Sequence, residues 1–451
     1  MKKQTILMLV VLGLVPILAF TQVQVGSDIL SPGDGDILGL SMNEDGTRVA
    51  IGTPLYDGVR GRLRVYSYNG SEWTQTGQDI IGETAVDFTG FSADLDAPGD
   101  RLIVGSPNHN TNQGRVVVYD YDGANWVQVG STILGANPSD CGRNVSISNS
   151  GTVIAVGESG TNNGTGRVRV FDFDGSDWVL KGQELNGQEG GSAFGFSLDL
   201  NDTGDRIAIG SPNFEEGSIR MFEFDGNAWN PLGQEISGDA MVDRFGEYVS
   251  ISGSGYRIAV GAPGSDIAGE NSGLVRVFDY NGQQWQVVGQ DIFGPSGISW
   301  FGLVSLTNSG NALAATKGGA NDAFIYEFEN NGWVQKAQLS DAASVAFNGN
   351  ATRFAAGGFE LTRIYDLSGV LGTEQMEHQQ GVTLYPNPAN DLIYITGNDD
   401  SLDFEIYSMQ GSMVAKGKAD EEINVSHLPS GIYIVKLFDR KAASYHRVLI
   451  Q

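Results

Sequence analysis

Apolar and polar residues alternate with a period of two along most of the chain after residue 20, in short runs separated by glycine-rich turns. Residues 248–292 contain four such runs, which read YVSIS, RIAVG, LVRVFDY and WQVVGQDI. This alternation is typical of strands that bury one face. Because no long segment with the 3.6-residue period of a helix follows, the sequence predicts an all-β protein.

The second of these runs recurs seven times, as the unit Gly-x-Arg-apolar-Ala-apolar-Gly or a degraded form of it. The copies begin at positions 46, 99, 151, 204, 255, 310 and 351. A regular spacing of about 50 residues in an all-β chain is typical of a propeller or an array. With four runs in each copy, the sequence predicts a seven-bladed β-propeller with four-stranded blades.

The last copy lacks its fourth strand. It ends after LTRIYDL at residues 361–367, whereas VQVGSDI at residues 23–29 nearly repeats VQVGSTI, a fourth run at residues 127–133. We therefore expect the N-terminal strand to complete the last blade, which removes the open edge of an incomplete ring. The propeller then spans residues 22–368.

Asn-Gly or Asp-Gly joins the third and fourth runs six times, and a tryptophan follows within three positions. These dipeptides predict two-residue type I′ turns, because Asn, Asp and Gly tolerate positive φ. The tryptophans are interpreted as core residues, with a sugar-stacking surface as the alternative. The pairs with their tryptophans are Asn69-Gly70 and Trp73, Asp122-Gly123 and Trp126, Asp174-Gly175 and Trp178, Asp225-Gly226 and Trp229, Asn281-Gly282 and Trp285, and Asn331-Gly332 and Trp333.

The N-terminus has the pattern of a secretory signal peptide. Two lysines precede an apolar run that ends at Phe20 and is shorter than the about 20 residues of a membrane-spanning helix. We expect residues 1–21 to form the signal peptide, with cleavage between Ala19 and Gln24 and no membrane span afterwards. The mature chain then leaves the cytoplasm.

The net charge and the cysteine content limit which partners and which disulfides the protein can have. The net charge of −27 argues against nucleic acid and anionic membranes as partners. The single cysteine, Cys141, can form no internal disulfide. It stands where other copies have phenylalanine, so it is predicted to be a small core residue.

Phe245-Gly246 together with Gly261-Ala262-Pro263 resembles the FG-GAP repeats of integrin α-subunit propellers, and more closely their bacterial secreted version. The resemblance implies the propeller fold but no particular activity. Many integrin-type repeats bind calcium in a D-x-D-x-D-G-like loop, whereas the loops here lack three alternating carboxylates before a glycine. No cofactor or metal is therefore expected, and calcium remains a minor alternative. The loops read MNEDGT (42–47), DAPGDR (96–101), NDTGDR (201–206) and SGSGYR (253–258).

The tail is a separate unit. After a polar linker at residues 369–380, residues 381–451 form short alternating runs with Pro and Gly turns, which predict a small Ig-like β-sandwich. The tail resembles the C-terminal sorting domain of the type IX secretion system, although Arg447 stands where that family usually has lysine. The motif residues are Tyr385, Pro386, Asn387, Pro388, Gly431 and Tyr433. The resemblance implies contact with the type IX machinery, passage across an outer membrane, and surface attachment or release.

The two faces of the predicted propeller differ. The first-to-second and third-to-fourth turns are short and share one face, here called the base. The second-to-third loops and the blade connections are long and share the other face, here called the crown. Binding residues concentrate in loops on a rigid scaffold, so the crown is the candidate binding face. Its candidate residues are Asp57, Glu83, Asp87, Asp140, Glu189, Asp239, Asp243 and Asp266, and Glu158, Glu215, Glu216 and Glu270 also fall there.

Most of these acids are interpreted as a solvated rim, with a site for cationic ligands as the alternative. Some are expected to cap turns or to pair with the second-run arginines, which are Arg48, Arg101, Arg206 and Arg257.

Catalytic motifs are missing from the propeller sequence. Its one histidine, His109, is expected to be a solvated loop residue, and no GxSxG, HExxH or Cys–His pattern is present. The prediction is a monomeric, non-catalytic binding or adhesion protein, secreted or on the cell surface, with a glycan or protein partner. The alternatives are a calcium-dependent integrin-like adhesin and a polysaccharide-active enzyme with two converging acids.

Overall fold

The computed structural model describes residues 23–136, 138–295, 299–318 and 321–371, and, in the tail, 383–385, 389, 392–396, 402–408, 413–419, 422–426, 428–429, 431–438 and 443–450. The predicted signal peptide, most of the predicted linker, and Pro386, Asn387 and Pro388 lie outside the described residues. The chain divides into two compact units, residues 1–371 and 372–451.

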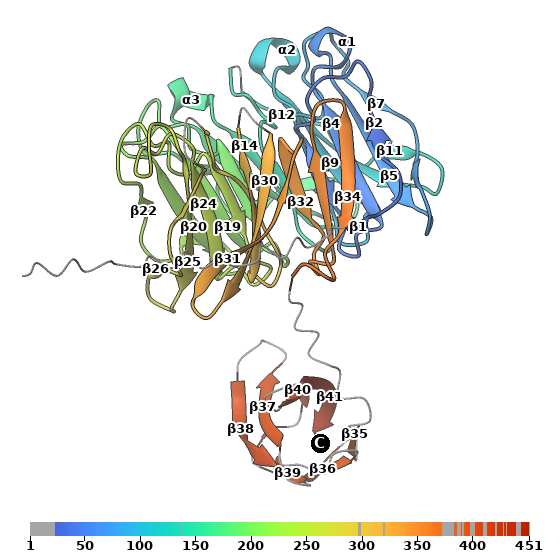
Figure 1. The fold of residues 1–451 in the computed structure, drawn as a ribbon, viewed down its shortest axis with the longest axis vertical. Coiled ribbons are helices and arrows are strands. Elements are labelled where there is room, and N and C mark those ends of the chain that lie inside the picture. The colour runs from blue at the N-terminus through green and yellow to red at the C-terminus, as the bar shows by residue number, and fades with distance from the viewer. Residues whose placement is uncertain are drawn as a thin grey trace, which may run out of the picture. The chain divides into compact units, whose positions relative to one another are not determined.

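The described part of the first unit forms seven antiparallel sheets around a ring, which confirms the predicted propeller (Figure 1). From the centre outward, the blades contain β3 (Leu40–Met42), β4 (Arg48–Thr53), β5 (Arg62–Tyr68) and β6 (Trp73–Gln75); β8 (Ser92–Leu95), β9 (Arg101–Ser106), β10 (Arg115–Tyr121) and β11 (Trp126–Gln128); β13 (Val145–Ile147), β14 (Val153–Glu158), β15 (Arg167–Phe173) and β16 (Trp178–Leu180); and β18 (Ser197–Leu200), β19 (Arg206–Ser211), β20 (Ser218–Phe224) and β21 (Trp229–Pro231). Blades five to seven contain β23 (Tyr248–Ile251), β24 (Arg257–Ala262), β25 (Leu274–Tyr280) and β26 (Trp285–Val287); β28 (Leu303–Leu306), β29 (Ala312–Lys317), β30 (Asp322–Glu329) and β31 (Gly332–Leu339); and β32 (Ser344–Phe347), β33 (Arg353–Gly357) and β34 (Leu361–Asp366). In blades one to five a short strand also pairs with the third strand, and these are β7 (Ile80–Ile81), β12 (Ile133–Leu134), β17 (Leu185–Asn186), β22 (Ile236–Ser237) and β27 (Ile292–Phe293).

The N-terminal strand closes the last blade, as the sequence predicts. β1 (Val23–Gln24) and β2 (Ile29–Leu30) both pair antiparallel with β34. Val23 lies opposite Asp366, and Ile29 lies opposite Thr362. The strand edge that β34 would otherwise present is therefore covered.

The six repeat tryptophans connect neighbouring blades. Five are 2–8% exposed and the sixth, Trp73, is half-buried, which confirms the core interpretation. Each indole N–H donates to a backbone carbonyl of the preceding blade, at 2.7–3.1 Å. The pairs are Trp73 with Val25, Trp126 with Thr76, Trp178 with Val129, Trp229 with Lys181, Trp285 with Leu232, and Trp333 with Val288.

The predicted type I′ turns at Asn-Gly and Asp-Gly are wrong. In five blades the last aromatic residue of the third strand pairs with the tryptophan, as Tyr121 pairs with Trp126, so four residues form the loop. The Asp122 carboxylate accepts the backbone N–H groups of Ala124 and Asn125 at 2.8 and 2.7 Å, and only the glycine has positive φ. In blade six, by contrast, the two-residue loop is Asn330-Asn331, and both residues have positive φ.

The second-strand arginines lie at the base, not beside the crown carboxylates, so that predicted pairing is wrong. Each begins its strand directly after the base hairpin and donates to a carbonyl in the corresponding turn of the next blade. These contacts join Arg48 to Gly99, Arg101 to Gly151, Arg206 to Ser254, Arg257 to Gly310, and Arg353 to Gly46. The last of them crosses the closing junction of the ring.

The second unit consists of two antiparallel sheets. One contains β35 (Thr383–Tyr385), β36 (Leu392–Thr396) and β39 (Glu422–Asn424), and the other contains β38 (Met413–Ala419), β37 (Leu402–Ser408), β40 (Gly431–Phe438) and β41 (Ala443–Ile450). Ile393 and Ile423 of the first sheet share a core with Ile406 and Val435 of the second, so the unit is a sandwich. Among the residues described here and in the propeller, no helix has the length and apolar character needed to cross a membrane.

Candidate functional site

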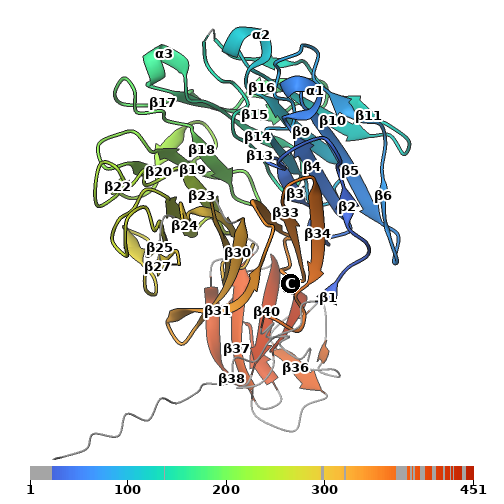
Figure 2. The ribbon, with the colours of Figure 1, turned by 45° about the horizontal axis from the view of Figure 1, so that its top comes forward.

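The long loops gather on one face of the ring, as predicted for the crown. Three of the second-to-third loops contain a single helical turn, and these are α1 (Tyr56–Val59), α2 (His109–Asn112) and α3 (Thr161–Gly164). Figures 1 and 2 show all three turns on the same side of the propeller.

Asp87 is buried, so it is not part of an exposed binding face. Its carboxylate accepts the backbone N–H groups of Glu83 and Thr84 at 2.7 and 3.1 Å and lies 3.2 Å from Nδ1 of His109. Burial raises the pKa of Asp87, but hydrogen bonds from Thr84, His109 and Glu83 outweigh it and hold the pKa below its ordinary value. Asp87 therefore fixes the loop that carries it, and His109 is not a solvated residue as predicted.

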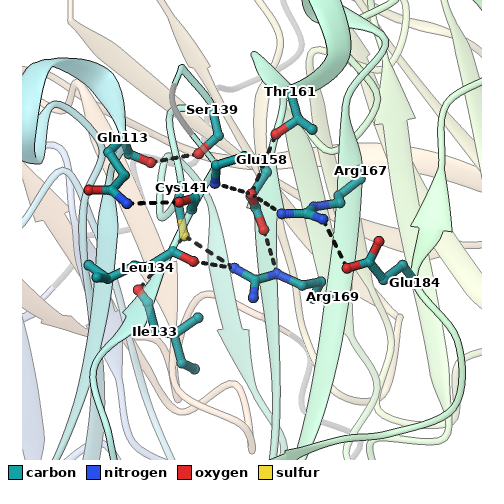
Figure 3. A network of polar contacts seen from close by, with 12 residues as sticks. Gln113, Ile133, Leu134, Ser139, Cys141, Glu158, Thr161, Arg167, Arg169 and Glu184 are labelled. Atoms are coloured by element: carbon teal, nitrogen blue, oxygen red, sulfur yellow. Dashed lines mark hydrogen bonds and ion pairs between the residues drawn. The ribbon is translucent and has the colours of Figure 1, made fainter.

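Glu158 is also buried, in a network at the crown between blades two and three (Figure 3). Its two carboxylate oxygens bind Arg167 at 2.8 Å and Arg169 at 2.5 Å, and Arg167 also binds Glu184 at 2.9 Å. Arg169 further donates to the carbonyl of Leu134 at 2.8 Å. The network holds the third strand of one blade against the connection from the blade before it.

The other predicted crown residues are divided between loop contacts and solvent. Asp243 is 2% exposed, and burial raises its pKa, so it does not present an accessible carboxylate. Three of them form ion pairs, Glu83 with Arg115, Asp239 with Arg276 at 3.0 Å, and Asp57 with Arg60 at 3.6 Å. Asp266 accepts the backbone N–H of Asn271 at 2.6 Å. Asp140 is half-buried, and Glu189 is exposed. The crown arginines that bind these acids come mainly from third strands, a pairing that the sequence analysis missed. The sequence signal for this pairing was arginine at alternate positions of the third run, as in RLRV at residues 62–65 and RVRV at residues 167–170.

Cys141 is a buried core residue, as predicted. Gly114 bridges to it just as Gly166 and Gly217 bridge to Phe194 and Phe245 in later blades. Burial raises the pKa of the thiol to about 12, so it is uncharged at neutral pH.

The innermost strands enclose a channel through the ring. Its base segment, about 260 Å³, is lined by polar side chains that include Glu44, Asp94, Asp199 and Asp202. Its crown segment, about 300 Å³, is lined by Leu38, Phe91, Arg143, Asn144, Phe196, Glu247, Tyr248 and Leu303, among others. The crown segment combines apolar and polar side chains in its walls, and its volume is at the lower limit of ordinary ligand pockets.

A serine or aspartate at the same position of successive inner strands joins the blades inside the channel. The Asp94 carboxylate accepts the N–H of Ile147 at 3.0 Å, and the Asp199 carboxylate accepts that of Ile251 at 2.9 Å. Serines do the same elsewhere, where Ser41 accepts from Leu95, Ser146 from Leu200, Ser250 from Leu306, and Ser305 from Phe347. Blade seven has Ala346 at this position, so its junction with blade one relies on other contacts.

Asp199 is expected to make the stability of the propeller fall as pH rises. Burial raises its pKa to about 7 from the ordinary 3.8, so the protonated form is favoured in the folded state. Its stabilising contribution is complete below about pH 4 and is lost as pH rises through about 7. Between pH 5 and 8 Asp199→Asn should therefore gain about 2 kcal/mol relative to the unchanged protein in urea unfolding. Asp57→Asn, at an exposed carboxyl, is the control, and a pH-independent difference for Asp199→Asn would contradict the expectation.

Arg143 is the distinctive side chain of the crown segment. Its guanidinium carbon lies 5.1 Å from the ring centre of Phe91 and 4.4 Å from that of Phe196. Among the described residues its guanidinium makes no hydrogen bond or ion pair, and burial lowers its pKa. The carboxylates of Asp140 and Glu247 interact with Arg143 electrostatically, Glu247 lies 2.8 Å from Arg244, and burial raises the pKa of both acids. The channel mouth thus contains a half-buried cation that makes no hydrogen bond or ion pair with the described residues, and Glu247 lines the same cavity.

The sequence analysis did not identify Arg143, although the repeat contained a signal for it. The residue after the glycine of the FG motif is phenylalanine at Phe91 and Phe196, whereas blade three has Arg143 and blade five has Glu247. Two other copies have phenylalanine at this position, so a charged residue there departs from the repeat pattern. Both Arg143 and Glu247 line the crown segment of the channel.

Comparison with known proteins concerns the two units separately. The propeller is similar to the crystal structure of the Cps50 (Swd1) β-propeller domain of Myceliophteria thermophila, with a TM-score of 0.53 and 12% identity over 77% of this chain and 100% of that chain. At this identity the likeness concerns the fold alone. No curated protein matches the chain.

Residues 383–451 match the family described as the secretion system C-terminal sorting domain. The tail is a Por-type sorting domain. It belongs to the type IX system, so this β-propeller protein is secreted across the outer membrane to the cell surface or beyond. Within the sorting domain, the Tyr433 hydroxyl donates to the carbonyl of Pro429 at 2.9 Å and so fixes the turn of the LPSGIY motif. The resemblance of the propeller to FG-GAP repeats stays a prediction.

Proposed function

We propose that this secreted propeller is a non-catalytic binding or adhesion protein that holds a glycan or protein partner at its crown. The observation that carries the proposal is the crown segment of the channel, a cavity of about 300 Å³ with a half-buried arginine, Arg143, that has no hydrogen bond or ion pair among the described residues. Leaving a desolvated cation without acceptors destabilises a fold, and such groups recur where a ligand supplies the missing contacts. The exposed rim carboxylates, among them Asp57, Glu189 and Asp266, remain available for secondary contacts.

A polysaccharide-active enzyme would use two converging acids, and the channel contains Asp94 and Asp199. Both carboxylates already accept a backbone N–H from the next blade and a serine hydroxyl, with Ser41 at 2.7 Å from Asp94. Their geometry supports a role in joining blades. His109 and Cys141 are likewise engaged or buried, which favours binding over catalysis.

A binding screen tests the proposal. The purified chain is applied to an array of polysaccharides and extracellular proteins, once with calcium and once with chelator. Binding that survives the chelator supports the proposal, whereas binding lost with the chelator favours the calcium-dependent adhesin. Release of reducing ends from a bound polysaccharide would establish the enzyme instead, and a blank array in both buffers would contradict binding.

A further inference from the structure

We infer that the ligand of the crown segment is a sugar acid, a pyranose residue whose carboxylate pairs with the guanidinium of Arg143. This inference rests on the proposed binding function and specifies its ligand. It follows from three features of the same cavity, namely a cation that has no hydrogen bond or ion pair among the described residues, two polar side chains without partners there, and apolar groups in the wall; the Glu247 carboxylate lines the cavity as well and acts on the same cation.

The cation selects a carboxylate. Phe91 and Phe196 pack against the guanidinium of Arg143, while its N–H groups have no acceptor in the part of the chain that the structure describes. A guanidinium is a planar fork of donors that matches the two oxygens of a carboxylate. Pairing with a half-buried cation in a partly enclosed cavity is stronger than pairing at the open surface.

The other polar groups suit hydroxyl groups. Asn144 and Tyr248 line the same cavity, and neither the Asn144 amide nor the Tyr248 hydroxyl has a hydrogen-bond partner among the described residues. By contrast, the hydroxyls of Ser92 and Ser197 donate to backbone carbonyls, both at 2.8 Å, so they are engaged. An amide and a phenol beside a guanidinium offer donors and acceptors for a carboxylate with neighbouring hydroxyls.

The apolar wall and the size of the cavity suit one sugar ring. Leu38 is 42% exposed at the rim and Leu303 is half-buried, so both present aliphatic surface to the cavity. A pyranose has C–H groups to place against such surface, and about 300 Å³ is at the lower limit of ordinary ligand pockets. A net charge of −27 disfavours a dense polyanion. The expected ligand is therefore a terminal or widely spaced uronic acid in a largely neutral glycan.

Binding of three small probes tests the carboxylate. D-glucuronate, its neutral amide D-glucuronamide, and D-glucose are titrated into the full chain by isothermal calorimetry and by saturation-transfer NMR. D-glucuronate should bind at least about tenfold more tightly than the other two, because only it forms the ion pair. Equal binding of glucuronate and glucuronamide, or binding of neither, would overturn the inference.

Arg143→Met separates a ligand role from a structural one. It should weaken glucuronate binding by at least about tenfold. It should also leave the melting temperature unchanged or raise it, because methionine fills similar space without an unpaired charge. A lowered melting temperature with unchanged glucuronate binding would show that Arg143 only supports Phe91 and Phe196. Arg60→Met removes a crown arginine outside the cavity and serves as the control that should bind normally.

Two outcomes distinguish this inference from the proposed function. An array hit that Arg143→Met leaves intact would keep the binding function and overturn the sugar-acid site. Arg143-dependent binding of an Asp-centred peptide, with no binding of glucuronate, would assign the cavity to a protein carboxylate and overturn the sugar.

Discussion

Deleting residues 23–30 is expected to lower the free energy of unfolding of the propeller by about 5 kcal/mol or more. The deletion removes the burial of Ile29, which is 5% exposed, and such a loss alone costs about 2–5 kcal/mol. It also removes backbone hydrogen bonds to β34 and the acceptor of the Trp73 indole, each contributing about 1 kcal/mol. The edge of β34 would then be open, so aggregation should increase as well.

Guanidinium unfolding followed by tryptophan fluorescence measures this loss. All seven tryptophans precede residue 372, so their emission reports on the propeller and not on the sorting domain. β2 itself offers a matched pair of point variants. Ile29→Ala should destabilise by about 2–4 kcal/mol, whereas Leu30→Ala, at a residue 58% exposed, should stay within about 0.5 kcal/mol. Equal midpoints for the deletion and the intact chain would mean that the strand does not close the ring.

Glu158→Gln is expected to destabilise the propeller by about 3 kcal/mol. The Glu158 side chain is 0% exposed and compensates two arginines, Arg167 and Arg169, as Figure 3 shows. Removing one partner of a buried ion pair leaves uncompensated charge, which is much more costly than losing a surface pair. The same fluorescence experiment measures the change.

Glu184→Gln is the control for that variant. Glu184 binds the same Arg167, at 2.9 Å, but its side chain is 39% exposed. Solvent screens such a pair, so its loss should cost less than about 1 kcal/mol. Similar effects of the two variants would mean that burial does not set the importance of Glu158.

The ring could be predicted because its determinants are local and repeated. The blades repeat the same four runs. VQVGSDI at residues 23–29 nearly repeats VQVGSTI at residues 127–133, so the missing outer strand of the last blade could be assigned. The turns could not be predicted from the dipeptide alone. Pairing of Tyr68 with Trp73 sets a four-residue loop, and the Asn69 side chain caps it by accepting the N–H groups of Ser71 and Glu72. Packing of the two aromatic rings, at 5.2 Å, thus outweighs the turn preference.

The site was harder to predict because it depends on distances between blades. Acidic residues are frequent in the crown loops, but the sequence does not show which are buried. Asp87 and Asp243 are buried, whereas Glu189 is exposed, although all three lie in blade connections. The lack of a hydrogen-bond or ion-pair partner for Arg143 among the described residues is likewise a property of the assembled channel, since no single repeat contains both the cation and the rings that flank it.

The pairing of Val23 with Asp366 also constrains how the protein is made. The ribosome completes β1 first, yet its partner β34 is among the last parts of the propeller to be synthesised, so ring closure waits for nearly the whole domain. The sorting domain, at residues 383–451, follows immediately afterwards. A chain that terminates early therefore lacks both the closed ring and the secretion signal. Export through the type IX system is in this way restricted to molecules whose translation has passed the last blade.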